Sequence, residues 1–283
     1  MHPKLKHYIS TIGDLPSVPA LVGEIMRLVE DPNASAEDLR RVIDRDPAVA
    51  ARILKVANSS LYGFSRAIET LSHAIALLGF RTVRNLVMAA SLRQAFKHFG
   101  LTEKLLWEHA TLAGVVAMRL ATHPRIAYDA EEAFTAGLLH DLGKIAFNNS
   151  SQEQYTKVVA RVYNEGLSFV AAEREEFGFD HAELGACVAD KWRLAESLVL
   201  AIRYHHSPEM LEKLDEKQRR LTALTTLTTA SCTRLGVGRR APVESLVLSA
   251  LPAWRALGLA EDDEDEILGL VEARVRQAED LIA

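Results

Sequence analysis

The stretch AGLLHDLGK at residues 136–144 places a histidine and an aspartate side by side at the end of an apolar, helix-forming run. Burying His140 next to Asp141 costs free energy unless the two groups are hydrogen-bonded, paired with a charge or bound to a metal. Lys144 follows three residues later, where it can neutralise Asp141 in an ordinary ion pair or attract a phosphate. The stretch therefore predicts a buried polar site, with a structural ion pair and a metal site as the two alternatives.

Helical periodicity extends from this stretch in both directions. Leu105 and Leu112 belong to an apolar face that predicts a helix at about 102–121. Glu131 suits the first turn of the next helix, which is expected to end near Gly143. No segment shows the sustained alternation of apolar and polar residues that is typical of a strand. The chain is therefore predicted to be all-α.

Several short signals predict where helices begin and end. Ser35 and Asp180 each precede an acidic residue by three positions, as in a capping box, and Asp46 precedes a proline at a first helical position. Gly79 is placed to end a helix. A soft boundary between two halves of the chain falls near Phe99, and the residues that could bind a metal or take part in a reaction follow it.

Five histidines and one aspartate after residue 100 lie on or at the ends of expected helices: His109, His140, Asp141, His181, His205 and His206. A single inward-facing histidine is more often a hydrogen-bonded core residue than a ligand, and His109 alone favours that interpretation. Several helix ends that offer imidazole or carboxylate groups can, however, converge on one cavity. Such nitrogen and oxygen donors suit a divalent ion such as Fe, Mn, Zn or Mg, and an ion held there can orient a phosphate.

The composition is that of an ordinary globular protein. A formal net charge of −5 over 283 residues disfavours a nucleic-acid binder, which usually carries a basic surplus. Arg81, Arg84, Arg93 and Lys97 could form a basic stripe, but they are interpreted as solvent-facing helix residues. The chain has neither a recognisable signal peptide nor a run of about 18 apolar residues. We therefore expect a cytoplasmic protein that does not bind membranes.

Two other features have a plain structural interpretation. The acidic run at residues 261–266 resembles a cation site, but acids before the last helix also favour its positive N-terminal end, which is the simpler account. Cys187 and Cys232 both lie in apolar helix-like segments and are expected to be reduced core thiols.

Three upstream segments accompany the AGLLHDLGK stretch in a fixed order. They read LPSVP at residues 15–19, DRDPAVAARILKVANSS at 44–60 and IETLSHAIALLG at 68–79. Together, the four segments resemble the HDOD family, the HD-related output domains of bacterial signal transduction. The resemblance covers about residues 11–210, and an ordered series of this length is far more specific than a bare His-Asp pair.

The resemblance implies an N-terminal helical lobe (1–100) packed on an HD-like helical bundle (101–235), with a C-terminal helical extension (236–283). His109 corresponds to the first histidine of HD domains, and His140 with Asp141 corresponds to their central pair. His181, His205 and His206 correspond to additional histidines of the related HD-GYP cyclic di-GMP phosphodiesterases.

Two departures from the enzymes of this superfamily bear on activity. HD enzymes usually supply a last aspartate from a later helix, and the expected equivalent here is Ser231, a poor replacement for a carboxylate ligand. His206 is followed by Ser207-Pro208-Glu209, so the glutamate and the Gly-Tyr-Pro loop of the cyclic di-GMP phosphodiesterases are missing. The first departure argues against catalysis, and the second argues against cyclic di-GMP phosphodiesterase activity in particular.

The resemblance therefore favours a stand-alone, non-catalytic signalling module with a vestigial or structural metal site. Its expected partners are other signalling proteins, or a small-molecule or nucleotide signal. The alternative is a metal-dependent phosphohydrolase that acts on a nucleotide or another phosphoester. In that case the five histidines and Asp141 would bind one or two metals, and Lys144 would place the phosphate.

Overall fold

A computed structural model describes residues 2–11, 20–31, 33–58, 62, 64, 67–97, 99–239 and 241–278. These residues form helices and contain no strand, so the predicted all-α class is confirmed. The chain divides into two compact units, one of residues 18–95 and 273–283, the other of residues 1–17 and 96–272. The division expected from the sequence, at residues 100 and 235, differs from these units, because residues 236–272 and the N-terminal helix both belong with the larger one.

The smaller unit is built from short helices with well-defined ends. They are α2 (Ala20–Glu30), α3 (Ala36–Ile43), α4 (Pro47–Ala57), α5 (Leu71–Leu78) and α6 (Phe80–Leu92), followed by a short 3-10 turn at Arg93–Ala95. Ser35 forms the predicted capping box with Asp38, Asp46 caps α4, and Gly79 ends α5. The LPSVP segment at 15–19 and residues 59–60 of the long motif lie outside the described residues.

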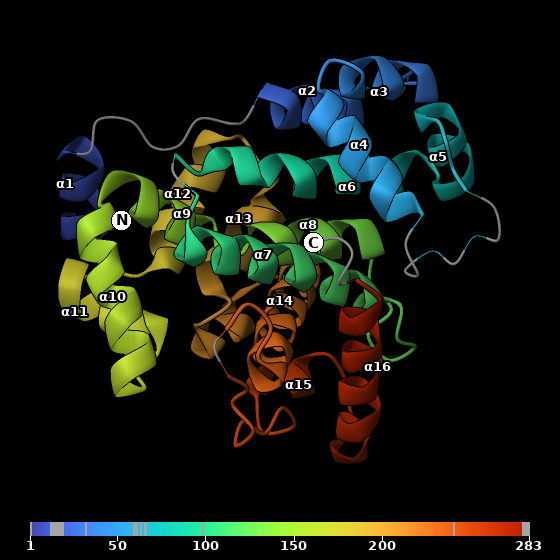
Figure 1. Cartoon of the computed structure of the whole chain (residues 1–283). Helices are drawn as coiled ribbons and strands as arrows, with labels where there is room; N and C mark the ends of the chain where they lie inside the picture. Colours follow the sequence, from blue (N-terminus) through green and yellow to red (C-terminus); the bar gives the residue numbers. More distant parts are fainter. Residues whose placement is uncertain are drawn as a thin grey trace. The chain divides into compact units, whose positions relative to one another are not determined.

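The larger unit contains the residues of the expected site. Its helices are α1 (Pro3–Thr11), α7 (Leu101–Ala121), α8 (Ala130–Leu139), α9 (Leu142–Ser150), α10 (Gln152–Glu165), α11 (Phe169–Phe177), α12 (His181–Lys191), α13 (Glu196–Tyr204), α14 (Glu216–Leu235) and α15 (Pro252–Ala256). A last helix, α16 (Glu264–Gln277), begins in this unit. Helices α7, α8 and α14 pack on one another, and α12 packs on both α9 and α13 (Figure 1).

The prediction of a single helix from Glu131 to Gly143 is wrong. Helix α8 ends at Leu139 and α9 begins at Leu142, so His140 and Asp141 form the turn between them. This break lets α9 run directly against α12. A Cβ atom at residue 143 would collide with the backbone of His181 and Gly185, so glycine is required for this approach. The close crossing brings the start of α12 next to Asp141.

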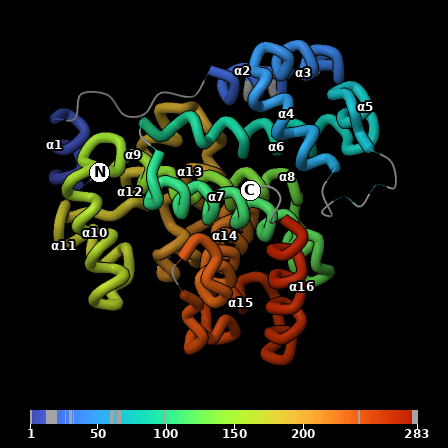
Figure 2. Tube along the Cα trace, viewed as in Figure 1, coloured from blue at the N-terminus to red at the C-terminus, as the bar shows by residue number. Residues whose placement is uncertain are grey.

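The N-terminal helix α1 belongs to the larger unit through one aromatic side chain. Tyr8 packs on Phe147, Phe177 and Phe179, with ring centroids 5.3–5.7 Å apart, and its hydroxyl lies 2.8 Å from the Ser150 hydroxyl. Figure 2 shows α1, in dark blue, against the yellow-green helices of this unit. Helix α1 is therefore held to the body that carries the site, although the chain then leads into the smaller unit.

The remaining structural expectations can be compared directly. The acids Glu264, Asp265 and Glu266 stand in the first turn of α16, as predicted. Cys187 and Cys232 are buried and free. Among the described residues, no single helix has the length and apolar character needed to cross a bilayer, and only the sharply bent pair of α5 with the segment Phe80–Ala95 meets that test when taken together.

Candidate metal centre and ligand pocket

The predicted convergence of imidazoles around Asp141 is confirmed. The Nε2 atoms of His109 and His140 lie 3.6 and 3.3 Å from Asp141 Oδ2, and His181 Nε2 lies 3.2 Å from Asp141 Oδ1. The His205 ring stacks edge-on against that of His140, with centroids 5.2 Å apart, and lies 4.1 Å from the ring of His206. Helices α7, α12 and α13 and the α8–α9 turn each contribute to this cluster.

Hydrogen bonds on the outer side of the cluster fix the tautomers of four imidazoles. The Nδ1 atoms of His109, His140 and His205 lie 2.9, 2.7 and 2.7 Å from the carbonyl oxygens of Val237, Gly137 and Ile202. A carbonyl can only accept, so each Nδ1 must donate its hydrogen. A neutral ring that donates from Nδ1 carries its lone pair on Nε2. The free lone pairs of these rings therefore face the centre of the cluster.

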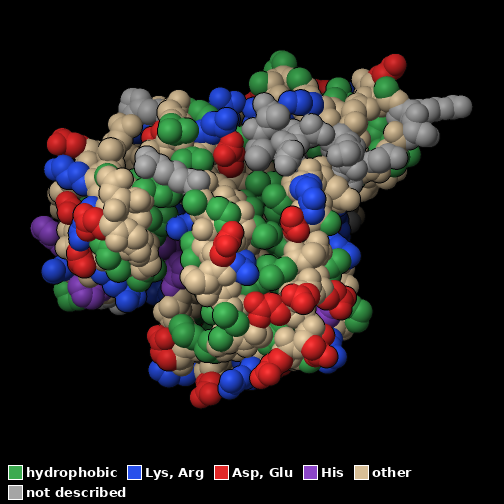
Figure 3. Space-filling view, turned by 60° about the horizontal axis from the view of Figure 1, so that its bottom comes forward, with side chains coloured by type: hydrophobic (Ala, Val, Ile, Leu, Met, Phe, Trp, Pro, Cys, Tyr) green, Lys and Arg blue, Asp and Glu red, His purple; other side chains and the backbone are tan. Residues whose placement is uncertain are grey.

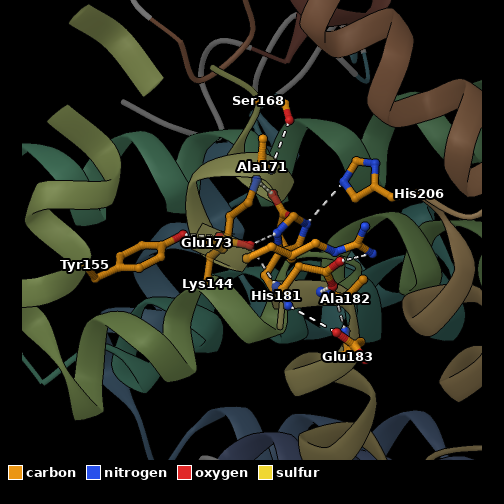
Figure 4. Close-up of polar contacts among 12 residues, drawn as sticks. Lys144, Tyr155, Ser168, Ala171, Glu173, His181, Ala182, Glu183 and His206 are labelled. Carbon is orange, nitrogen blue, oxygen red and sulfur yellow. Dashed lines mark hydrogen bonds and ion pairs between the residues drawn. The ribbon is translucent and has the colours of Figure 1, made fainter. Parts of the chain in front are cut away.

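A buried carboxylate, which the sequence interpretation missed, orients the fourth ring. Glu173 on α11 accepts hydrogen bonds from the backbone N–H of His181 at 2.8 Å and from its Nδ1 at 2.6 Å, through the same oxygen. Its other oxygen accepts from the Tyr155 hydroxyl at 3.0 Å. Figure 4 shows Tyr155, Glu173, His181 and His206 in one continuous row of contacts. Nε2 of His181 is therefore an acceptor, and it lies 3.2 Å from both His206 Nε2 and Asp141 Oδ1.

Charge and burial favour neutral imidazoles around an ionised carboxylate. Burial lowers the pKa of His109 to about 4 and that of His181 to about 3. Burial alone would raise the pKa of Asp141, but neighbouring His140 and Lys144 hold that pKa well below its usual range. At neutral pH the site therefore presents lone pairs and one negative charge, the donor set that a divalent cation requires.

The donor atoms of this site fit a divalent metal. His140 Nε2, His205 Nε2 and Asp141 Oδ1 are buried and have no hydrogen-bond partner. Lone pairs that face one another at 3.2–3.6 Å repel unless a cation lies between them. The ligand atoms form two groups, each within 4.8 Å: His109 with His140 and Asp141, and His181 with His205 and His206. The arrangement can hold one ion or two.

The sequence left two interactions open for Lys144, an ion pair with Asp141 and the attraction of a phosphate, and its position is compatible with both. Its Nζ lies 2.8 Å from Asp141 Oδ2 in a buried ion pair. The same ammonium lies 4.2 Å from the centroid of the Phe169 ring, and the residue also lines a pocket above the site. Lys144 therefore stabilises the ionised form of Asp141 and at the same time presents positive charge to anything bound in the pocket.

The pocket has a volume of about 540 Å³ and opens onto the cluster through His109, Asp141, Lys144 and His206. His206 is exposed, whereas the other four rings are buried. In Figure 3, histidine side chains (purple) are visible at the base of a furrow in the surface. A volume of this size suits a small organic molecule. The metal donors are therefore accessible to a ligand from one side.

The helix expected to supply the last aspartate of HD enzymes is α14, where the sequence comparison assigned the equivalent position to Ser231. Ser231 is fully buried, and its hydroxyl has no hydrogen-bond partner among the described residues. Thr229 and Thr233, one helical turn apart on α14, line the pocket. Residues four apart share a face of a helix and residues two apart do not, so these threonines and Ser231 lie on different faces of α14. The prediction that this helix offers no carboxylate at the site is confirmed, since no acid follows Glu216 in α14.

Comparisons with known proteins agree with this architecture. The sequence profile of the HDOD domain matches residues 15–208. An uncharacterized protein of Treponema pallidum (strain Nichols) is 27% identical over 244 residues, which are 86% of this chain but 47% of the relative, so the chain spans about half the length of that curated relative.

Two crystal structures share the fold. An HDOD domain protein of unknown function from Geobacter sulfurreducens is 26% identical, with a TM-score of 0.81 over 99% of this chain and 97% of its own. A Shewanella amazonensis protein with a provisional phosphohydrolase designation is 22% identical, with a TM-score of 0.71 over 99% and 98% of the two chains. At that level of identity the second structure supports the fold alone. With the profile match over residues 15–208, these findings show that the chain belongs to the HDOD domain family.

Proposed function

We propose that this chain is a signalling module that binds a phosphate-bearing small molecule at a divalent metal centre without hydrolysing it, and that other signalling proteins read its ligand state. One observation carries the proposal. Four imidazoles have their Nδ1 atoms committed to outer partners, so their Nε2 atoms face the cluster around Asp141, and this cluster meets an open pocket at His109, Asp141 and His206.

The charges at the base of the pocket favour an anionic ligand. Asp141 and the five imidazoles would hold the metal, and the bound ion would supply the positive charge that attracts a phosphoryl oxygen. Lys144 adds a second positive charge on the pocket wall. A phosphate is the common biological group that combines several acceptor oxygens with a double negative charge, so it matches both features.

The residues available for proton transfer favour binding over turnover. Among the described residues that line the pocket, Asp141 is the only acid, and it is already paired with Lys144 at 2.8 Å. A carboxylate acting as a general base needs to be within reach of the nucleophile and free to accept a proton. Thr229 and Thr233 offer hydroxyls on the helix from which HD enzymes usually supply an aspartate. The described lining of the pocket therefore offers groups that suit a phosphate, and no acid besides Asp141.

A metal-dependent phosphohydrolase is the second candidate, and one observation favours it. His206 and Asp141 both reach the pocket surface, so the phosphate of a bound ester or nucleotide would lie against the same donors that hold the metal. This is the geometry in which a metal can assist hydrolysis. The two candidates therefore share a binding site and differ in turnover.

Metal content, phosphate binding and turnover of the full-length, untagged protein separate the candidates. We expect bound divalent metal, calorimetric binding of inorganic phosphate that disappears after metal removal, and no product from cyclic dinucleotides, nucleotides or p-nitrophenyl phosphate. Asp141→Asn should lose the metal and the binding, whereas His73→Gln, a change at an exposed histidine outside the site, should retain both. Turnover that Asp141→Asn abolishes would establish the phosphohydrolase instead. Absence of metal and of phosphate binding would contradict both candidates.

A further inference from the structure

The loop that follows α14 is built against the metal centre, although it lies beyond residue 208, where the family match ends. The Val237 carbonyl accepts the Nδ1 hydrogen of His109 at 2.9 Å. Gly238 adopts a positive φ of 63°, and a Cβ atom there would lie 2.5 Å from His109 Cβ and 2.7 Å from the Leu105 carbonyl oxygen. Only glycine permits this backbone conformation together with so close an approach. The loop is therefore fixed against α7 at the position of a metal donor.

This fixed loop places Arg239 in the wall of the pocket. The Arg239 Nε is buried and has no hydrogen-bond partner. No acidic side chain of a described residue lies within ion-pair distance of its guanidinium, in contrast to Lys144, which is paired with Asp141. A buried guanidinium nitrogen without a partner costs free energy, and an anionic ligand that accepts from it would remove that cost. Arg239 is therefore a cation in the pocket wall whose buried Nε has no partner among the described residues.

The pocket lining also contains apolar and aromatic side chains. They include Leu105 and Leu106 on α7, Val159 and Tyr163 on α10, and Val243 beyond the loop. Covering such side chains with the apolar or aromatic atoms of a ligand lowers the free energy of binding. Inorganic phosphate alone would leave them in contact with water. The pocket therefore combines cationic groups and candidate metal donors with apolar surface.

We propose that Arg239 is the specificity-determining residue of this pocket, and that the ligand is a phosphate monoester with an apolar or ring-bearing body. The phosphate lies between the metal centre and Arg239, whose planar guanidinium can donate two hydrogen bonds to one phosphate. The body of the ligand lies against the apolar wall. This inference rests on the proposed function, because it assumes that the metal centre holds a phosphate.

Calorimetric titration of the Mn²⁺-loaded, full-length protein tests the assignment, with inorganic phosphate and phenylphosphonate as probes. A phosphohydrolase cannot cleave phenylphosphonate, so turnover does not obscure its binding. We expect phenylphosphonate to bind more tightly than inorganic phosphate, and phenol, which lacks the anion, not to bind measurably. Arg239→Gln should weaken phenylphosphonate binding roughly tenfold or more, the usual size of a lost charge-assisted pair. Arg239→Lys should recover part of that loss, because it restores the charge without the planar donor pair.

Controls separate this inference from the proposed function. Metal content should be unchanged in Arg239→Gln, since Arg239 is not among the grouped metal donors. Lys157→Gln removes an exposed cation from α10, which also contributes to the pocket wall, and should leave binding unchanged. Equal phenylphosphonate affinity in the unaltered protein and Arg239→Gln would overturn the role of Arg239 while leaving the proposed function intact. Failure of the unaltered, metal-loaded protein to bind either probe would overturn both.

Discussion

At the scale of single residues, the contact between Glu173 and His181 leads to a direct prediction about metal affinity. Glu173 is fully buried and accepts from both the backbone and the ring of His181. Carboxylates that hold the outer nitrogen of a ligating histidine fix its tautomer and raise its basicity, and their loss typically lowers metal affinity about 10–100-fold. The same range is expected here if His181 binds metal through Nε2.

The substitution Glu173→Gln tests this role with little change in side-chain shape. Metal affinity, measured by competition with a chromophoric chelator, should fall by roughly one to two orders of magnitude. Glu175→Gln is the matched control, because Glu175 is an exposed neighbour on the same helix whose recorded partner is Arg161. Equal affinities for the two variants would show that Glu173 has a structural role only.

The buried imidazoles also predict how the metal-depleted protein responds to acid. The pKa values of His109, about 4, and His181, about 3, lie below the value of about 6.5 in an unfolded chain, and burial also lowers the pKa of His205. As pH falls below about 6.5, the unfolded chain therefore takes up protons that the folded chain does not, which lowers the free energy of unfolding. Glu173 changes the free energy of unfolding in the opposite direction. Burial raises its pKa to about 8, so the folded chain retains a proton that the unfolded chain releases above about 4.5.

Three imidazoles outweigh one carboxyl group, so the free energy of unfolding should fall between pH 6.5 and 4.5. Urea denaturation of the metal-depleted protein at these two pH values measures the change. A free energy of unfolding that is equal or higher at pH 4.5 would mean that these rings are not buried in their neutral form.

Sequence patterns identified the histidines but not the residue that orients one of them. His140 and Asp141 stand out because a polar pair interrupts an apolar run. Glu173 belongs to the charged run Glu173-Arg174-Glu175-Glu176, which is typical of a solvated helix face. Only the packing of α11 on its neighbours buries this carboxylate, and no local pattern records that contact.

At the scale of elements, the crossing of α9 and α12 controls the position of His181. Gly143→Ala would push a Cβ into the backbone of α12, so one of the two helices must move. We expect destabilisation of at least about 1–3 kcal/mol, the usual cost of overpacking, together with weaker metal binding. Urea denaturation and metal affinity measure the two effects.

Gly269→Ala is the matched control for this prediction. Gly269 lies in α16 with no atom within 4 Å of the position of its Cβ, so alanine there should stabilise by about 0.5–1 kcal/mol through higher helix propensity. Gly143→Ala of normal stability would contradict the described crossing.

Helix ends that depend on local chemistry were predicted well, and those that depend on tertiary contacts were not. The caps at Ser35, Asp46 and Asp180 follow from side chains within three residues of the helix start. The break between α8 and α9 accompanies the close packing of α9 on α12, which is distant in sequence, and periodicity alone predicted one helix to Gly143.

At the scale of the whole molecule, a metal bound at this centre would connect helices from several parts of the chain. Its donors come from α7, the α8–α9 turn, α12 and the end of α13. A ligand that binds only the folded state stabilises it by about 2.7 kcal/mol at 100 times its dissociation constant. Removal of the metal with EDTA should therefore lower Tm by several degrees, measured by differential scanning calorimetry. Asp141→Asn should show no such difference between metal-loaded and EDTA-treated samples, and an equal difference in both proteins would place the stabilising metal elsewhere.

The boundaries of the two compact units were the feature hardest to predict from the sequence. Composition shifts only softly near Phe99, and nothing in residues 2–11 indicates that this helix belongs with the later part of the chain. The association depends on Tyr8 packing among three phenylalanines more than 130 positions away. The sequence therefore predicted the helical class and the clustering of histidines around Asp141, whereas long-range packing set the limits of the units.

The claim on which the function depends is that imidazole nitrogens and Asp141 hold a divalent ion that a phosphate can reach. Pulsed electron paramagnetic resonance of Mn²⁺ bound to the full-length protein tests it most directly. We expect hyperfine couplings from imidazole ¹⁴N, loss of bound Mn²⁺ in Asp141→Asn, and a ³¹P coupling after inorganic phosphate is added. Mn²⁺ that fails to bind, or that binds without nitrogen coupling, would contradict the account.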